Sequence, residues 1–228
     1  MSIKVVAKRL RDSLQRGIYV IIDPLVKGMI ALGITPNMVT TIGLLGNIAA
    51  AIVFVYAGYS AGQTGIIPYQ LVTLGGALII GFSLFDMLDG QVARIGGKAS
   101  TFGAMYDSVL DRYCEMFTLG GISYFFLCSG NLWGAWVTYL GVIGSIMVSY
   151  VRARAEGLGI ECKIGFMQRP ERVVVTALGA LVCGILGQNG IEWAEWILFG
   201  AMALIALFAN ITAIARLGYS KARLNDKK

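Results

Sequence analysis

The sequence predicts an all-α integral membrane protein with six transmembrane helices and an N-terminal interfacial amphipathic helix. Of its 228 residues, 57% are hydrophobic and only 14% are charged, which is too apolar for an ordinary soluble domain. The mean hydropathy is +0.71, and the apolar stretches approach the roughly 20 residues that a helix needs to cross a bilayer. Lys and Arg gather in some connecting segments and are missing from others, a pattern typical of multi-pass membrane proteins.

The first 34 residues are predicted to form a juxtamembrane segment (1–34). Residues 1–17 carry apolar side chains on one side of a helix and basic side chains around them, which is typical of a helix that lies in the membrane interface. The apolar set is Ile3, Val6, Leu10 and Leu14, and the basic set is Lys4, Lys8, Arg9, Arg11 and Arg16. Residues 18–33 are apolar but interrupted by Asp23, Pro24 and Lys27, which predicts a re-entrant or surface-lying continuation.

Residues 35–218 are predicted to form one six-helix domain, followed by a short basic cytoplasmic tail over 219–228. Thr35 and Pro36 match a helix N-cap followed by proline at the first helical position. The six spans are predicted at 37–57, 68–92, 102–127, 132–153, 170–187 and 193–215.

The distribution of basic residues predicts the orientation in the membrane. The turns near 58–67, 128–131 and 188–192 contain no Lys or Arg, whereas the other connections and both ends of the chain contain most of them. Because basic loops stay in the cytoplasm, we expect both termini to be cytoplasmic. The net charge of +6 then reflects orientation and contact with anionic headgroups, and it does not indicate nucleic-acid binding. A cell membrane, the inner or plasma membrane, is the expected location.

Histidine and cysteine usage excludes several kinds of site. The chain has no histidine, so Ser-His and Cys-His nucleophilic mechanisms and His-ligated haem are excluded. The cysteines at 114, 128, 162 and 183 are scattered and match neither a zinc site nor a disulfide framework. A general base must therefore come from another residue type, and carboxylates are the obvious supply.

Four aspartates lie inside otherwise apolar, membrane-length stretches: Asp86, Asp89, Asp107 and Asp111. Carboxylates at membrane depth usually bind an ion, relay protons or line a polar cavity. A helix turns by about 100° per residue, so Asp86 and Asp89 share one face of their helix, as do Asp107 and Asp111 on theirs. If the two helices face each other, the four carboxylates converge on one volume.

Four converging carboxylates would repel one another strongly in a low dielectric. Either several of them are protonated, or cations lie between them. An all-oxygen ligand set without His or Cys suits hard divalent cations, Mg²⁺ first and then Mn²⁺ or Ca²⁺. A structural polar network, or salt bridges with Arg94 and Arg112, is the alternative.

The aspartates belong to a longer motif that resembles the signature of the CDP-alcohol phosphotransferases, D-x-x-D-G-x-x-A-R-x8-G-x-x-x-D-x-x-x-D. Every fixed position of that signature is filled between Asp86 and Asp111. Six spans with cytoplasmic termini are also similar to the fold of that family. The resemblance implies a magnesium-dependent transfer in which an acceptor hydroxyl attacks the β-phosphorus of a CDP-linked lipid and CMP leaves.

The resemblance also implies roles for particular residues. Two Mg²⁺ ions, with Mn²⁺ as a substitute, would be held by Asp86, Asp89 and Asp107, and Asp111 would act as catalytic base and as a further ligand. The CDP-lipid would contact Asn37, Met38, Val39, Thr40, Gly90, Ala93, Arg94, Ser100 and Gly103.

The acceptor side resembles one branch of this family, the prokaryotic phosphatidylinositol-phosphate synthases. The stretches 149–156 (SYVRARAE) and 169–172 (RPER) match regions of those enzymes, with Arg at 152 where Lys is frequent. The resemblance implies that Arg152, Arg172 and Arg216 bind the phosphate of an inositol phosphate, because guanidinium groups can bind phosphate bidentately.

The sequence therefore favours a phosphatidylinositol-phosphate synthase, a divalent-metal-dependent enzyme that converts CDP-diacylglycerol and inositol phosphate to phosphatidylinositol phosphate and CMP. Transfer to glycerol 3-phosphate on the same catalytic core is one alternative. A cation transporter that uses the four aspartates as its ion path is another. The family resemblance also implies a homodimer.

Overall fold

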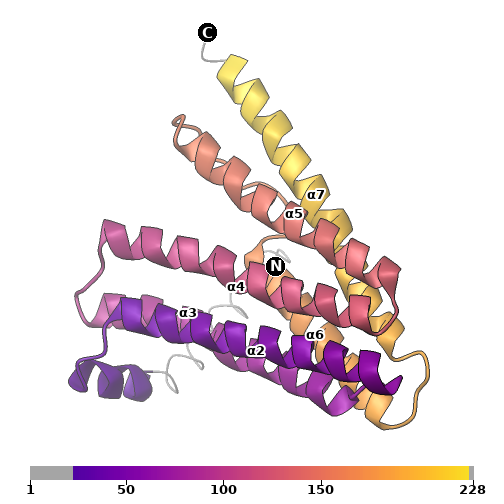
Figure 1. Cartoon of the computed structure of the whole chain (residues 1–228). Helices are drawn as coiled ribbons and strands as arrows, with labels where there is room; N and C mark the ends of the chain where they lie inside the picture. The colour runs from indigo at the N-terminus through magenta and orange to yellow at the C-terminus, as the bar shows by residue number, and fades with distance from the viewer. Residues whose placement is uncertain (1–22, 226–228) are drawn as a thin grey trace, which may run out of the picture. The chain divides into compact units, whose positions relative to one another are not determined.

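The computed structural model describes residues 23–225, except for the side chains of residues 86 and 87. Within this range the chain is helical and contains no strand (Figure 1). Six long helices follow one another: α2 (Pro36–Thr64), α3 (Tyr69–Ile95), α4 (Thr101–Cys128), α5 (Leu132–Glu156), α6 (Arg169–Gln188) and α7 (Glu195–Asn225). The all-α prediction is confirmed, and each predicted span corresponds to one of these helices. The predicted interfacial helix over 1–17 lies outside the described residues.

The start of α2 follows the local signals in the sequence. The backbone N–H of Met38 donates a hydrogen bond to Thr35 Oγ1 at 3.3 Å, so Thr35 caps the helix that begins at Pro36. Before this cap, residues 23–31 are helical and end in a turn where Gly33 has φ +77°, a value that favours glycine. The interruption that Pro24 suggested is therefore the start of a short helix. At the other end of the chain, α7 continues to Asn225, past the predicted domain boundary at 218.

Five of the six helices are long and apolar enough to cross a membrane: α2, α3, α5, α6 and α7. Helix α4 differs because its charged side chains, those of Asp107, Asp111, Arg112 and Glu115, lie inside the helix and leave no apolar stretch of spanning length. The structure thus supports a multi-pass membrane protein. Length and composition account for five spans, one fewer than predicted.

Two compact units are distinguished within the chain. Among the described residues, unit 1 comprises 23–43 and Leu84–Leu110, and unit 2 comprises Leu44–Ser83 and 111–225. In unit 1, Val26 and Val39 pack with Leu88 and Val92, which fixes the first turns of α2 against the last turns of α3.

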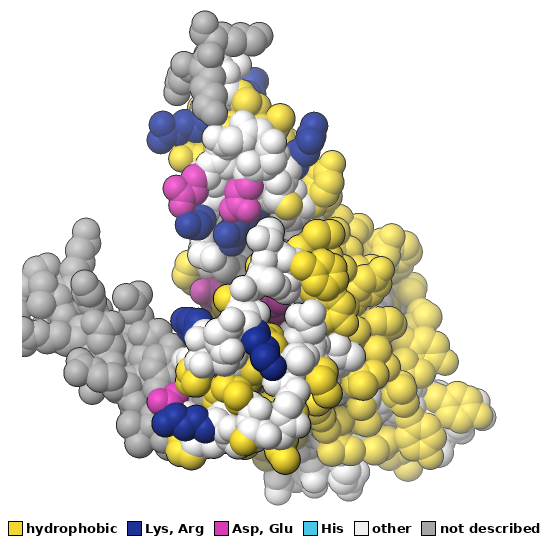
Figure 2. Space-filling model, turned by 90° about the vertical axis from the view of Figure 1, so that its left-hand side faces the viewer, with side chains coloured by type: hydrophobic (Ala, Val, Ile, Leu, Met, Phe, Trp, Pro, Cys, Tyr) yellow, Lys and Arg dark blue, Asp and Glu magenta, His cyan; other side chains and the backbone are white. Residues whose placement is uncertain are grey.

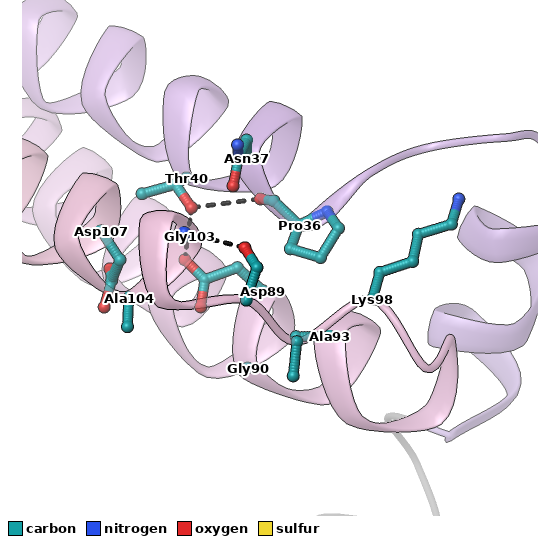
Figure 3. A pocket seen from close by; sticks show the side chains of 12 residues that line it. Pro36, Asn37, Thr40, Asp89, Gly90, Ala93, Lys98, Gly103, Ala104 and Asp107 are labelled. Atoms are coloured by element: carbon teal, nitrogen blue, oxygen red, sulfur yellow. Dashed lines mark hydrogen bonds between the residues drawn. The ribbon is translucent and has the colours of Figure 1, made fainter.

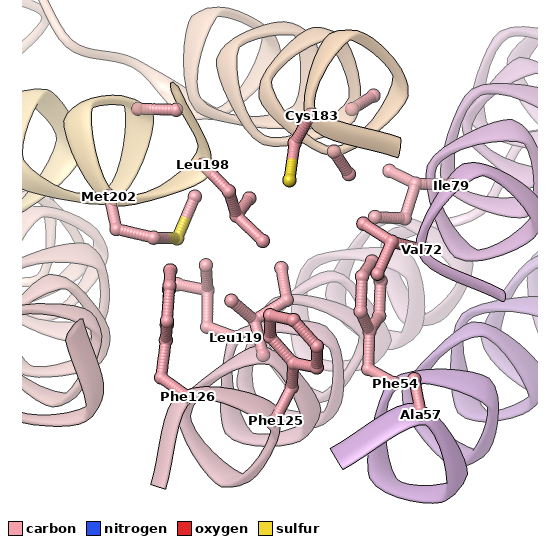
Figure 4. Packing of buried hydrophobic residues seen from close by; sticks show 14 of the residues in the cluster. Phe54, Ala57, Val72, Ile79, Leu119, Phe125, Phe126, Cys183, Leu198 and Met202 are labelled. Atoms are coloured by element: carbon pink, nitrogen blue, oxygen red, sulfur yellow. The ribbon is translucent and has the colours of Figure 1, made fainter. Parts of the chain in front are cut away.

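Unit 2 contains the larger apolar core. Its largest buried side chains are aromatic and come from α2 and α4, and residues of α3, α6 and α7 pack against them (Figure 4). The buried set includes Phe54, Val72, Ile79, Leu119, Phe125, Phe126, Cys183, Leu198 and Met202. Close approach of α2 and α4 depends on a small residue, because a Cβ at Gly121 would lie 2.7 Å from the carbonyl oxygen of Ala51.

The helices expose many large apolar side chains, as expected for surfaces that contact lipid. Trp133 is 76% exposed and Ile214 is 71% exposed. Figure 2 shows hydrophobic side chains covering a large area of the face it draws. In a soluble monomer an apolar surface of this extent would be a liability, so it agrees with a membrane location.

Candidate active site

Unit 1 contains a cavity of about 230 Å³ where three helices meet (Figure 3). It is formed by the first turns of α2 and α4, the last turns of α3 and the loop between α3 and α4. The lining residues are Pro36, Asn37, Thr40, Asp89, Gly90, Ala93, Lys98, Ala99, Ser100, Gly103, Ala104 and Asp107. Two of the four predicted aspartates, Asp89 and Asp107, therefore face one cavity.

Asp89 is held in place from α2. The Thr40 hydroxyl donates a hydrogen bond to Asp89 Oδ2 at 2.8 Å and also lies 3.1 Å from the carbonyl oxygen of Pro36. Asp89 is only 6% exposed and Thr40 5%. A carboxylate held in a fixed orientation at a cavity wall can offer an oxygen ligand to a cation.

The same cavity is also suited to an anion. Helices α2 and α4 both begin at its wall, and the N-terminus of a helix carries partial positive charge. The backbone N–H of Gly103 donates to Ser100 Oγ at 3.0 Å, so Ser100 caps α4 as its side chain lines the cavity. Lys98 adds a full positive charge. Carboxylates, helix N-termini and an ammonium group together match a phosphate ester that is bound with a cation.

Glycine at position 103 keeps this cavity open. A Cβ there would lie 3.0 Å from Ser100 Oγ and 3.4 Å from Asn37 Oδ1. The neighbouring atoms would have to move to accommodate it.

Unit 2 contains a second, smaller cavity of about 160 Å³ that is rich in arginine. It is lined by Asp111, Arg112, Val148, Ser149, Arg152, Gln168, Arg169, Pro170, Arg172 and Arg216. The three predicted acceptor arginines, Arg152, Arg172 and Arg216, therefore come together around one space. Five guanidinium groups and a single carboxylate among the lining residues suit a strongly anionic ligand.

Arg172 is engaged in a buried ion pair within the protein. Its Nε and one terminal nitrogen bind the two carboxylate oxygens of Glu115 bidentately, the latter at 2.8 Å. Its other terminal nitrogen donates to the Met167 carbonyl oxygen at 3.0 Å. The side chains of Arg172 and Glu115 are 1% and 9% exposed. Much of the hydrogen-bonding capacity of Arg172 is thus used inside the protein.

Arg216 and Arg152 differ in exposure. Arg216 is 2% exposed and donates to the carbonyl oxygens of Ile164 and Val148 at 2.8 and 2.7 Å. It therefore joins α7 to α5 and to the loop that precedes α6. Arg152 pairs with Glu156 one turn later on α5 at 2.8 Å, and its side chain is 38% exposed. Of the three predicted acceptor residues, Arg152 is the most accessible.

Asp111 has arginine neighbours in its own unit. Arg169 contacts Asp111 Oδ1 at 2.9 Å, and Arg112 lies 3.9 Å from Asp111 Oδ2. The ion pair with Arg112, which belonged to the alternative to a metal site, is therefore present but long, and Arg169 is the shorter contact. Together these contacts fix the orientation of a carboxylate that is 13% exposed.

The CDP-alcohol phosphatidyltransferase family matches residues 33–210, which include every residue that lines either cavity except Arg216. The chain belongs to this family. The segment from Asp86 to Asp111 lies inside the matched range, and its residues Asp89, Gly90, Ala93, Gly103 and Asp107 line the cavity of unit 1.

Relatives of this CDP-alcohol phosphatidyltransferase include two kinds of inositol phosphate lipid synthase. An archaetidylinositol phosphate synthase from Methanothermobacter thermautotrophicus is 33% identical over 203 residues, which cover 89% of this chain and 90% of the relative. A phosphatidylinositol phosphate synthase from Mycobacteroides abscessus is 30% identical over 201 residues, 86% of this chain and 82% of the relative.

Solved structures of a phosphatidylinositol phosphate synthase from Mycobacterium tuberculosis share the fold. The structure with CDP-DAG bound has a TM-score of 0.73 and 28% identity, and covers 88% of this chain and 93% of that one. The complex with manganese and citrate has a TM-score of 0.74 and 28% identity, and covers 87% of this chain and 88% of that one.

Six of the nine predicted CDP-lipid residues line the cavity of unit 1: Asn37, Thr40, Gly90, Ala93, Ser100 and Gly103. The other three do not. Met38 is 51% exposed, Val39 is fully buried in the apolar cluster of unit 1, and Arg94 donates from Nε to the Gly90 carbonyl oxygen at 3.1 Å. Their predicted contacts with the donor remain predictions.

Several residues of these sites did not figure in the sequence-based assignment. Lys98 could have been found as the basic residue just before the Ser100 cap. Glu115 and Arg169 could not, because their partners lie far away in the sequence, at Arg172 and Asp111.

The oxygen ligands at the cavity of unit 1 suit a hard divalent cation, but the described part of the chain supplies only some of the ligands that such an ion needs. Asp89 and Asp107 share the cavity of unit 1, and both offer oxygen ligands. Among the described side chains, no group of three or more acidic, histidine or cysteine residues is close enough to hold a metal. The side chain of Asp86 is outside that description, and Asp111 belongs to unit 2.

Proposed function

We propose that this family member transfers the phosphatidyl group of CDP-diacylglycerol to an inositol phosphate, giving phosphatidylinositol phosphate and CMP. The observation that carries the proposal is the arginine-rich cavity of unit 2. The signature of the family supports a CDP-lipid as the donor, and the five arginines of this cavity support a phosphorylated acceptor.

The donor is assigned to the cavity of unit 1. Its diphosphate suits the helix N-termini of α2 and α4 and the ammonium group of Lys98. Asp89 and Asp107 would hold divalent cations there, and Asp86 and Asp111 would complete the ligand set. We assign two Mg²⁺ ions, which Mn²⁺ can replace, and a solved relative has been obtained in complex with manganese. When bound, the cations neutralise the diphosphate and stabilise the leaving oxygen.

The acceptor is assigned to the cavity of unit 2. Its phosphate is expected to contact Arg152 directly, with Arg172 and Arg216 deeper in the wall. The two kinds of relative differ in the lipid part of their names and share the inositol phosphate part. The relatives thus support the acceptor more strongly than they support a particular lipid tail.

The transfer itself requires one base. Asp111 accepts the proton of the attacking hydroxyl, the new bond forms between that oxygen and the β-phosphorus, and the bond to CMP breaks. Arg169 and Arg112 hold the Asp111 carboxylate in a defined orientation for this step.

We further propose six membrane spans, cytoplasmic termini and a homodimer in the cell membrane. Helix α4 contributes Leu119, Ile122 and Phe125 to the same apolar core as the five apolar helices, which supports counting it as a span. The connections 65–68, 129–131 and 189–194 contain no Lys or Arg, whereas the connections 96–100 and 157–168 do. This distribution supports a cytoplasmic active site.

The test is release of CMP from CDP-diacylglycerol by the purified protein, with one acceptor offered at a time. Inositol phosphate should give the fastest release, and glycerol 3-phosphate, free inositol and serine should give little. Equal or faster release with glycerol 3-phosphate would make the protein a glycerophosphate-type transferase and remove the proposed acceptor. Ion flux into vesicles without any CMP release would instead favour the cation transporter.

A further inference from the structure

A third cavity lies between the C-terminal parts of α5 and α7, which run side by side in unit 2 (Figure 1). Its volume is about 470 Å³, larger than either cavity described above. It is lined by Tyr150, Val151, Arg154, Ala155, Leu158, Leu217, Ser220, Lys221, Leu224 and Asn225. None of these residues lines the other two cavities.

The wall of this groove is mostly apolar and is open to the surroundings of the helices. Leu217 is 62% exposed, Tyr150 59% and Leu158 44%, whereas Val151 and Ala155 form a buried floor. The volume and the apolar wall of the groove match part of an acyl chain in size and chemistry.

Two cations lie at the same groove. Arg154 and Lys221 both line it, and none of its described lining residues is Asp or Glu. Among residues 23–225, neither one takes part in the ion pairs, which engage Arg112, Arg152, Lys163, Arg169 and Arg172 instead. Two cations without acidic partners beside an apolar groove are complementary to a lipid with an anionic headgroup.

Two arginines on opposite sides of α5 line this groove and the acceptor cavity, respectively. Arg152 and Arg154 are two residues apart, so they point in directions about 160° apart around the helix. Arg152 lines the acceptor cavity and Arg154 lines the groove. The same short basic motif thus serves two different surfaces.

We propose that this groove binds one anionic phospholipid of the surrounding bilayer, with its phosphate on Arg154 and Lys221 and an acyl chain along Leu217 and Leu224. The site is independent of the reaction, because it shares no residue with the donor or acceptor cavities. The lipid is recognised by the negative charge of its headgroup and by one of its acyl chains.

The test is native mass spectrometry of the full-length protein in detergent, titrated with phosphatidylglycerol or with phosphatidylcholine of the same chains. The wild type should retain one phosphatidylglycerol per chain more strongly than phosphatidylcholine. Changing Arg154→Gln and Lys221→Gln together should lower phosphatidylglycerol retention on the order of tenfold, because each cation near a membrane surface contributes to anionic lipid binding.

Arg223→Gln is the matched control. Arg223 is on the same helix, but its guanidinium lies over the ring of Tyr219, 5.3 Å from the centroid, and it does not line the groove. This variant should retain the lipid as the wild type does. Leu217→Gln changes an exposed apolar residue and should weaken both lipids without removing the preference for the anionic one.

Three results would overturn the proposal. These are equal retention of the two lipids by the wild type, unchanged retention by the double variant, and an equal loss in the Arg223→Gln control. The last of them would mean that the total positive charge of α7, and not this groove, attracts the lipid. Thermal unfolding of each variant shows that a loss of lipid is not a loss of fold.

Discussion

The buried pair of Glu115 and Arg172 gives the sharpest prediction about stability. Both side chains are almost completely buried, and Arg172 binds both carboxylate oxygens. Glu115→Ala would leave the guanidinium buried and without its counter-charge. Removing one partner of such a pair costs about 3–5 kcal/mol, so the midpoint of thermal unfolding should fall on the order of 10 °C.

The matched control is an exposed pair of the same kind. Lys163 and Glu161 approach to 2.6 Å, but their side chains are 64% and 72% exposed. The hydrogen bond from Lys163 lowers the pKa of the Glu161 carboxyl group. Glu161→Gln should nevertheless leave the unfolding midpoint unchanged, because water screens exposed pairs.

A double variant separates the structural role of Arg172 from its proposed role in acceptor binding. Replacing both partners by apolar residues, Glu115→Leu with Arg172→Met, removes the unpaired charge and should recover most of the lost stability. If Arg172 also binds the acceptor, this folded variant should still use inositol phosphate poorly, with CDP-lipid affinity unchanged. The assays are unfolding in detergent and CMP release at varied acceptor concentration. A midpoint for Glu115→Ala that equals the control would refute the reasoning.

Three further predictions concern the donor cavity and the base. Asp111→Asn should keep the fold and CDP-lipid binding but lower turnover by roughly 10²–10⁴-fold, and near-normal CMP release would remove Asp111 as the base. Gly103→Ala should weaken CDP-lipid use, because the new Cβ would crowd Ser100 and Asn37. Gly120→Ala on the same helix is the control and should not weaken it, because no atom lies within 4 Å of a Cβ there. Equal kinetics of the two variants would contradict this prediction. Removing divalent metal with a chelator should abolish CMP release, and Mg²⁺ or Mn²⁺ should restore it; activity that persists in the chelator would count against a metal site.

The positions of the helices could be predicted from the sequence because the signals are local. Apolar stretches of membrane length predict spans, and Thr35 followed by Pro36 predicts the start of α2. Helix α4 is the predicted span that length and composition alone do not support, because its charged side chains lie inside the helix. One face of its apolar second half, with Leu119, Ile122 and Phe125, is buried by other helices, which only the structure reveals.

The proposed donor site could be predicted more fully than the proposed acceptor site, again because its signals in the sequence are local. The residues predicted to bind the donor come from two short segments, 37–40 and the motif with fixed spacing between Asp86 and Asp111, and most of them line one cavity. Val39 packs in the apolar cluster and does not line the cavity, because neighbouring residues of a helix point about 100° apart, and its predicted contact with the donor stays a prediction. A contiguous segment of a helix cannot present all of its side chains to one ligand.

The acceptor side depends on contacts between residues that are distant in the sequence. Whether an arginine offers its donors to a ligand or to the protein is decided by partners such as Glu115, 57 positions before Arg172. No local spacing encodes that choice. The three arginines predicted for one role are therefore divided by the structure into two buried residues and one accessible residue.

This division changes what the acceptor phosphate is expected to meet first. The side chains of Arg152, Arg112 and Arg169 are 38%, 33% and 23% exposed, whereas Arg172 is 1% exposed. Since Arg152 is paired with Glu156 and Arg169 with Asp111, an arriving phosphate competes with those carboxylates for the guanidinium groups. Competition at Arg169 would release Asp111 from its ion pair as the acceptor binds. In the proposed mechanism the base, Asp111, and the acceptor phosphate would thus be linked through Arg169, and Arg169→Gln should alter both acceptor affinity and turnover.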